Sequence, residues 1–359
     1  MNVIIRVDSS DRIGTGNLMR CLTLAEALRV NGAAVQFCCR QLPGALIDLL
    51  KQRKFPITVL PAPTKSDGFS DSDGYASWLG VSQGEDADQV IARLHGKKAN
   101  WLVVDHYGLD IEWENRLAPY VDAIMVIDDL ANREHACNLL LDQNYTSAER
   151  YLNLVPDCCR LILGPSFAML RPEYSNFRAF QARRSAKVKR IFIYFGGSDS
   201  ANVSFKAMEA LSSRNHKHFL IDLVIGSNNS YRAVLEQQAS RRGLTFIHQS
   251  RIHLADLMAE ADLAIGAGGA TTWERLCLGL PSLVVTCADN QVPLAQILHN
   301  KGLIRLIGKS STITVEDIHD ALSVETETPN LFANSGAAMH MCDGDGVKRV
   351  LNQMDKCHI

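Results

Sequence analysis

Short apolar runs rich in valine and isoleucine recur along this chain, and a helical pattern follows each of them. The first run covers residues 3–7 and leads through a glycine-containing loop into a helical stretch over residues 18–30. Strands buried on both faces of a parallel sheet have this continuous apolar character. The same alternation starts again at residue 190, so the sequence predicts an α/β protein with two doubly wound sheets. Strands are expected at residues 3–7, 34–37, 57–60, 101–104, 123–127, 190–195, 219–225, 244–247, 263–265 and 282–285.

The length of 359 residues is too great for one ordinary core and suits two domains of similar size. We expect a first Rossmann-like domain over residues 1–165 and a second over residues 166–359. The polar, basic segment 178–190 lies near this boundary.

Charge and cysteine usage exclude several classes of protein. Lysine and arginine number 37 against 39 acidic residues, so the net charge of −2 favours neither nucleic acid nor a membrane surface as a partner. No apolar run approaches the ~20 residues that a membrane span needs, and the N-terminus lacks the apolar stretch of a signal peptide. The ten cysteines contain no C-x-x-C motif, which is typical of buried thiols in a reducing compartment. We therefore expect a cytoplasmic monomer that acts on a small molecule.

Three glycine-containing loops, at residues 8–20, 195–202 and 265–279, each join a predicted strand to a predicted helix. Glycine lets the backbone approach a ligand closely, and the free N–H groups of a helix start suit anions or sugar oxygens. The first loop lacks the third glycine of a dinucleotide fingerprint. In open α/β sheets ligands bind at the carboxyl ends of the strands. The three loops together therefore predict a ligand site, although a single such loop is equally typical of a tight turn.

These loops resemble those of the GT-B superfamily of UDP-sugar enzymes. The resemblance is strongest to the hydrolases of pseudaminic acid biosynthesis, which release UDP from UDP-2,4-diacetamido-2,4,6-trideoxy-β-L-altropyranose. It runs from residue 1 to about 310, and residues 105–108 and 128–131 are its most specific blocks. The resemblance implies two Rossmann-like domains facing a central cleft, with the sugar and the catalytic loop on the first and UDP on the second. It also implies inversion at the anomeric carbon by an activated water, with no metal and no cofactor.

Candidate substrate-binding residues lie on the three loops and after the strand at 282–285. Glu274 lies one turn into its helix, where its carboxylate can accept hydrogen bonds from a ribose diol. Alternatively, it is simply an acidic residue of the first turn, which the helix dipole favours. Asp199 can contact the ligand or cap the next helix. The full set is Asp8, Gly14, Gly16, Arg20, Gly197, Ser198, Asp199, Asn202, Gly269, Ala270, Thr271, Glu274, Asn290 and Gln291.

One position departs from the family. The hydrolases have Gly-x-Gly-His in the first loop, and that histidine is their presumed base, whereas this chain has Asn17. An amide does not accept a proton near neutral pH, although it can hold a water or a sugar hydroxyl. Either the base is disabled while binding survives, or another residue supplies it. His106 is the first substitute, and Asp8 and Asp11 come after it; Tyr107 is placed to touch the sugar or to pack on the loop. The catalytic candidates are thus Asn17, His106 and Tyr107.

Three functions compete at this point. The first is hydrolysis of a UDP-linked diacetamido-trideoxyhexose, impaired in this chain by Asn17. The second is transfer of the sugar from a UDP-sugar donor to an acceptor, and the third is a catalytically silent UDP-sugar binder. Release of UDP in the absence of an acceptor distinguishes the hydrolase from the other two.

Overall fold

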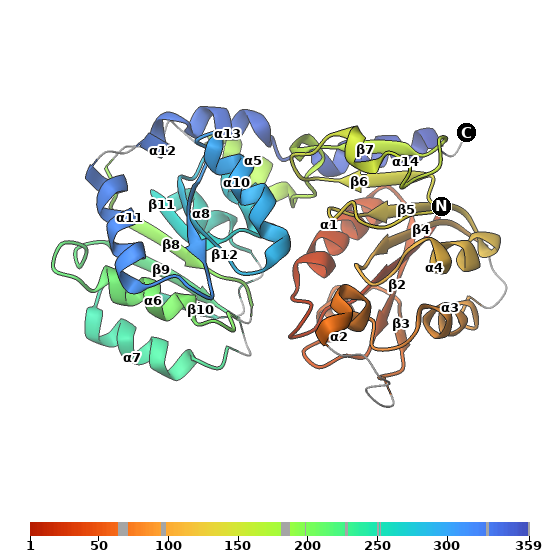
Figure 1. The fold of residues 1–359 in the computed structure, drawn as a ribbon, viewed down its shortest axis with the longest axis horizontal. Coiled ribbons are helices and arrows are strands. Elements are labelled where there is room, and N and C mark those ends of the chain that lie inside the picture. Colours follow the sequence, from red (N-terminus) through yellow and green to blue (C-terminus); the bar gives the residue numbers. More distant parts are fainter. Residues whose placement is uncertain are drawn as a thin grey trace. The chain divides into compact units, whose positions relative to one another are not determined.

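A computed structural model describes residues 1–63, 71–94, 98–180, 187–197, 199–226, 229–249, 251, 253–327 and 330–357. The chain divides into two compact units (Figure 1). The N-terminal unit comprises residues 1–169 together with residues 345–359, and the C-terminal unit comprises residues 170–344.

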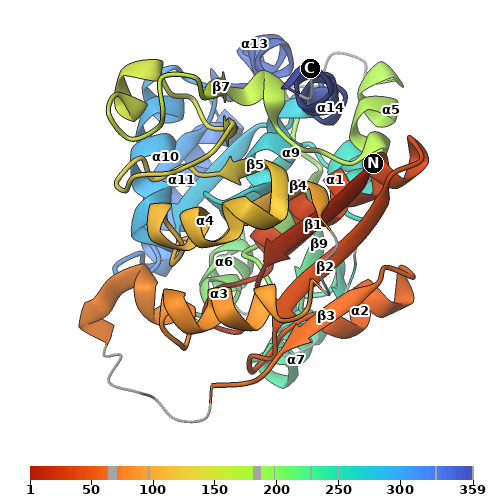
Figure 2. The same cartoon turned by 90° about the vertical axis from the view of Figure 1, so that its right-hand side faces the viewer.

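The N-terminal unit contains a parallel sheet in the order β3-β2-β1-β4-β5-β6-β7. Figure 2 shows β1, β2 and β3 side by side. The strands are β1 (Asn2–Val7), β2 (Ala34–Arg40), β3 (Ile57–Leu60), β4 (Ala99–Asp105), β5 (Val121–Ile127), β6 (Leu139–Asp142) and β7 (Arg160–Leu163). The helices are α1 (Gly16–Val30), α2 (Ile47–Gln52), α3 (Gln83–Ile91), α4 (Ile111–Leu117) and α14 (Gly346–Cys357).

Both faces of this sheet are covered, which explains the unbroken apolar runs of its strands. In β4, Trp101 and Val103 pack into one core with side chains of α1 and α14. Leu102 and Val104 point to the opposite face and pack with side chains of α3 and α4. Successive residues of a strand face opposite sides, so burial on both sides requires every position to be apolar.

The C-terminal unit repeats this plan with a parallel sheet in the order β10-β9-β8-β11-β12-β13. Its strands are β8 (Arg190–Tyr194), β9 (Leu220–Ile225), β10 (Thr245–Gln249), β11 (Leu263–Ala267), β12 (Ser282–Thr286) and β13 (Arg305–Lys309). Its helices are α5 (Pro172–Phe180), α6 (Val203–Leu211), α7 (Arg232–Arg242), α8 (Ala255–Glu260), α9 (Thr271–Cys277), α10 (Val292–Asn300), α11 (Val315–Glu327), α12 (Asn330–Ala333) and α13 (Ser335–Met341). None of the helices among the described residues has the length and apolar character needed to cross a membrane.

The predicted α/β class with two doubly wound sheets is confirmed, and all ten expected strands are present. Three further strands, β6, β7 and β13, were not predicted. Two of them have only four residues and β13 carries a glycine and two basic residues, so their apolar signal is weak.

The assignment of residues 345–359 to the second domain is corrected. These residues belong to the N-terminal unit, because α14 buries Val347, Val350 and Met354 in the core that α1 shares with the sheet. The helix is amphipathic, but its sequence does not reveal against which sheet the apolar stripe packs.

The place of α14 in the N-terminal core can be tested with Met354→Ala. Met354 is fully buried, so its truncation should lower the free energy of unfolding of this unit by about 2–5 kcal/mol. Urea unfolding followed by fluorescence measures this loss. Lys356→Ala, at an exposed position of the same helix, should change stability by less than about 0.5 kcal/mol. Equal effects of the two substitutions would contradict the packing of α14.

Candidate functional site

In the N-terminal unit, the order of the strands creates a switch point between β1 and β4. On one side of β1 lies β2, which the chain reaches through α1, and on the other side lies β4. Val7 at the end of β1 lies in register with Asp105 at the end of β4. Such a point is where open α/β sheets bind ligands, and the first glycine loop lies there.

Asp105 is the centre of a charged cluster at this switch point. Its buried carboxylate accepts hydrogen bonds from Arg20 Nη2 at 2.6 Å and Arg20 Nε at 2.7 Å. Asn17 Nδ2 donates to the same carboxylate at 3.0 Å. Asn17 and Arg20 are three residues apart on α1 and therefore share one helix face. Because a carboxylate only accepts, the amide nitrogen of Asn17 must face Asp105, which turns Oδ1 away from it.

Asp129, two residues beyond β5, joins the cluster through two other contacts. Tyr107 Oη donates to Asp129 Oδ1 at 2.6 Å, and Arg20 Nη1 lies 3.5 Å from Asp129 Oδ2. Burial raises the pKa of Asp129, and the charge of Arg20 opposes this shift. The ring of Tyr107 also packs against Tyr75 at a centroid distance of 5.0 Å. Arg20 thus bridges two carboxylates that follow neighbouring strands.

Asp8 belongs to a second network of charged groups, which is fully buried. The Arg6 guanidinium pairs with Asp8 at 2.6 Å and with Asp86 at 2.7 Å. The Arg40 guanidinium also pairs with Asp86, and the backbone N–H of Arg40 donates to Asp8. The two arginines hold the pKa of Asp86 at about 2. Asp8, predicted to bind substrate, is thus already engaged by buried donors.

His106 is buried, and its Nδ1 atom is engaged in a hydrogen bond. Its Nδ1 accepts a hydrogen bond from the backbone N–H of Gly108 at 3.0 Å, which places the proton on Nε2. Nε2 lies 3.5 Å from Asp8 Oδ2 but makes no hydrogen bond to the described residues. Burial lowers the pKa of His106 to about 4. This geometry leaves no lone pair for a substrate proton and argues against His106 as the substitute base.

The first glycine loop closes on itself before α1 begins. Gly14 has a φ of +80° and donates its N–H to the Ser10 carbonyl at 2.8 Å. No atom lies within 4 Å of a Cβ placed on Gly14, so the positive φ and not crowding favours glycine there. Gly16 is exposed at the first turn of α1.

In the C-terminal unit, the loops after β8 and β11 occupy the equivalent switch point, because β8 pairs with both β9 and β11. The carboxylate of Asp199 accepts from the backbone N–H groups of Val203 at 2.9 Å and Ser204 at 3.0 Å. Asp199 therefore caps α6, the alternative role that the sequence left open. Asn202 has a φ of +50°, and its buried Oδ1 makes no hydrogen bond to the described residues. Gly197 lies close to Gly226, because a Cβ placed on Gly226 would lie 2.0 Å from the Gly197 carbonyl oxygen. Ser198 lies outside the described residues.

The third loop combines backbone glycines with one available carboxylate. Arg275 fixes the loop by donating to the Ala267 carbonyl at 2.8 Å and to Thr271 Oγ1 at 3.3 Å. Glu274 has its Oε2 atom buried without a hydrogen-bond partner among the described residues. Burial raises the pKa of Glu274, and the charge of Arg171 and the neighbouring Tyr174 hydroxyl oppose this shift. An unsatisfied buried carboxylate oxygen is costly, which is consistent with a donor supplied by a ligand.

Gln291 closes the same site from the loop after β12. Its Nε2 lies 3.5 Å from a Cβ placed on Gly269, and its Oε1 accepts from the backbone N–H of Cys287 at 2.9 Å. The structure therefore brings together Gly269 and Gln291, which are far apart in sequence. Ala270 immediately precedes α9, and Asn290 is half-buried beside Gln291.

Sequence reasoning assigned no individual role to Asp105, Asp129 or Arg171. The first two follow or end predicted strands, and that position was the signal that could have selected them.

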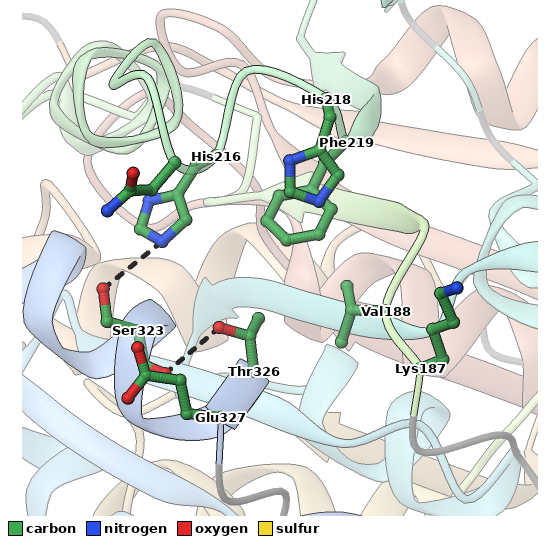
Figure 3. A pocket seen from close by; sticks show the side chains of 9 residues that line it. Lys187, Val188, His216, His218, Phe219, Ser323, Thr326 and Glu327 are labelled. Atoms are coloured by element: carbon green, nitrogen blue, oxygen red, sulfur yellow. Dashed lines mark hydrogen bonds between the residues drawn. The ribbon is translucent and has the colours of Figure 1, made fainter.

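A separate cavity of about 310 Å³ lies at the opposite, amino end of the C-terminal sheet (Figure 3). Val188 precedes β8 and Phe219 precedes β9, and both line it. On its wall His216 Nε2 lies 3.3 Å from Ser323 Oγ of α11. None of the predicted site residues lines this cavity.

Comparison with known proteins decides the fold family. Residues 191–350 match the C-terminal domain of glycosyltransferase family 28. The chain superimposes over 99% of its length on 99% of MurG from Acinetobacter baumannii, with a TM-score of 0.62 and 15% identity. The chain also superimposes over 99% of its length on 99% of LpCGTa, solved in complex with UDP, with a TM-score of 0.66 and 12% identity. The chain has the GT-B fold.

This GT-B chain is also similar to the UDP-2,4-diacetamido-2,4,6-trideoxy-β-L-altropyranose hydrolase of Campylobacter jejuni. The two are 26% identical over 305 residues, which cover 84% of this chain and 97% of that protein. The resemblance predicted from the sequence motifs is thereby confirmed.

The buried state of His106 in this GT-B protein predicts a pH dependence of stability. An unfolded histidine binds its proton near pH 6.5, whereas the folded chain binds it only near pH 4. Between these values the unfolded chain holds more protons, so stability is lost as the pH falls through this window. His106→Gln should remove this component, which amounts to on the order of 3 kcal/mol between pH 7 and pH 4.

Urea unfolding of both chains at several pH values measures the difference, since other groups titrate equally in both. The exposed His340→Gln serves as the control. A pH dependence unchanged by His106→Gln would contradict the burial of a neutral imidazole.

Proposed function

We propose that this chain hydrolyses a UDP-linked 2,4-diacetamido-2,4,6-trideoxyhexose to UDP and the free sugar, with inversion at the anomeric carbon and without a metal. The observation that carries this proposal is the bond between Asn17 and the buried Asp105. In the related hydrolases a histidine is the presumed base at this position. A carboxylate that holds one nitrogen of an imidazole leaves the other nitrogen to accept a proton. In this chain Asp105 is the carboxylate that would orient such an imidazole at position 17.

The proposal divides the work between the two units. On the C-terminal unit, Glu274, the backbone of Gly269–Thr271 and the Asn290–Gln291 pair are proposed to hold UDP. The buried Glu274 Oε2 supports this, because it has no hydrogen bond to the described residues and a ribose hydroxyl would supply one. On the N-terminal unit, the loop from Gly14 to Arg20 and Tyr107 are proposed to lie beside the sugar.

Asn17 is proposed to hold the attacking water or a sugar hydroxyl through Oδ1, which points away from Asp105. The C1–O bond to the diphosphate breaks as the water oxygen attacks from the opposite face. UDP leaves with the bonding electrons. The similarity to the Campylobacter hydrolase supports a place for this reaction in pseudaminic acid biosynthesis.

A glycosyltransferase is the second candidate, because residues 191–350 match a glycosyltransferase C-terminal domain. A silent UDP-sugar binder is the third, because Asn17 replaces the presumed base. NMR of the chain with the UDP-sugar separates all three. The hydrolase forms UDP and the sugar of inverted configuration in water alone, whereas the transferase requires an acceptor and the binder leaves the substrate intact.

Glu274→Gln should weaken UDP binding. Loss of a charge-assisted hydrogen bond to a ribose hydroxyl costs about 1.5–3 kcal/mol, which corresponds to roughly a 10- to 150-fold rise in Kd. Titration calorimetry with UDP measures the change. Glu316→Gln, at an exposed position of α11, is the matched control. An unchanged Kd for Glu274→Gln would exclude the ribose contact.

Asn17→His should raise the rate of UDP release at least tenfold, because it places an imidazole on Asp105 and general-base help is worth roughly 10²–10⁴-fold. Single-turnover assays with the UDP-sugar follow this rate. Asn31→His, at the exposed end of α1, should leave it unchanged. No increase with Asn17→His would show that position 17 does not carry the base in this fold.

A further inference from the structure

Five aspartates lie at the carboxyl ends of β1, β4, β5 and β6 or within two residues of them, and among these five only one reaches solvent. Asp11, the exposed candidate on the first glycine loop, lies four residues beyond β1. The side chains of four are fully buried and each is engaged by fixed donors. The side chain of Asp129 is 13% exposed. A group that takes a proton from a bound water must meet that water, so exposure separates Asp129 from the rest. The four buried aspartates are Asp8, Asp105, Asp128 and Asp142.

The two oxygens of Asp129 have different surroundings. Oδ1 accepts the short 2.6 Å hydrogen bond from Tyr107 Oη, which fixes the orientation of the carboxylate. Oδ2 has one long contact among the described residues, the 3.5 Å approach of Arg20 Nη1. Each carboxylate oxygen has two lone pairs. Oδ2 therefore keeps the capacity to accept a hydrogen from water.

Asp129 is also linked to the position where the related hydrolases carry their histidine. The Arg20 guanidinium contacts both Asp129 and Asp105, and Asp105 holds the Asn17 amide. One side chain thus fixes the carboxylate and the amide in the same cluster. For Asp129 to act as a base, a water bound by Asn17 Oδ1 must lie within hydrogen-bond reach of Asp129 Oδ2.

The charges around Asp129 favour its action as a base. Arg20 of α1 and the Tyr107 hydroxyl stabilise its ionised form, whereas burial and the neighbouring Asp105 and Asp128 disfavour it. The balance raises the pKa of Asp129 above the usual value of an aspartate. A carboxylate whose pKa moves toward the working pH is a stronger proton acceptor.

We infer that Asp129 is the general base of this chain and replaces the missing histidine in the hydrolysis proposed above. The inference rests on that proposed function. Asp129 Oδ2 takes one proton from water while the water oxygen bonds to the anomeric carbon. The C1–O bond to UDP breaks at the same time, and UDP takes its electron pair. The protonated Asp129 then returns its proton to solvent through its exposed side.

The test is a cycle of variants at positions 129 and 17. In the native chain, Asp129→Asn should lower single-turnover UDP release by about 10²-fold or more, since an amide accepts no proton. In the Asn17→His chain, where an imidazole serves as base, the same substitution should cost less than tenfold. A structural role for Asp129 would predict equal losses in the two backgrounds. Asp48→Asn, at a side chain 84% exposed on α2, is the matched control.

A pH profile supplies a readout that a structural role would not move. The acid limb of native UDP release should lie above the range of an ordinary aspartate and should shift upward when Asn17→His introduces the imidazole. Urea unfolding shows that the N-terminal unit of each variant is folded, and calorimetry with UDP checks the C-terminal unit.

The outcomes are separable. Native release retained in Asp129→Asn, or equal losses in both backgrounds, overturns Asp129 as the base while the hydrolase remains. Release by Asn17→His but not by the native chain also overturns it. Absence of release from every variant, with UDP binding intact, overturns the proposed hydrolysis itself.

Discussion

The buried ion pair between Arg20 and Asp105 is the interaction on which the N-terminal site depends. It ties the first turns of α1 to the end of β4, across the point where the strand order reverses. Removing one partner of a buried pair leaves an uncompensated charge, which typically costs 3–5 kcal/mol. The same pair fixes the orientation of Asn17 and reaches Asp129. The polar chemistry of the site is thus built into the packing of helix on sheet.

A second set of buried charges involves arginines on β1 and β2 of the same sheet. Arg6 and Arg40 are neutralised by Asp8 and Asp86 inside the unit. These groups explain why polar residues interrupt β1 and β2 at their carboxyl ends. In the sequence Asp8 looks like a ligand-binding candidate, because a residue after a strand has the same pattern whether it faces a ligand or a buried partner.

The fold class could be predicted from the sequence because its main signal, a continuous apolar run at each strand, is local. Runs such as residues 101–104 are apolar at every position, which only a doubly covered parallel strand requires. The short strands β6, β7 and β13 and the destination of α14 were missed, since they depend on contacts with distant residues. At the site, the loops could be located from glycines and strand ends. The roles of His106 and Asp199 could not, because they depend on which backbone N–H groups each side chain meets.

The return of α14 to the N-terminal unit has a consequence for synthesis of the protein. The C-terminal unit is an insertion within the N-terminal one, so it is complete on the ribosome before the last helix emerges. The core around α1 lacks Val347, Val350 and Met354 throughout that time. At about 5–20 residues per second, the insertion takes roughly ten to thirty seconds to translate. The core of the unit that begins first is therefore completed only when α14 is made, after the C-terminal unit.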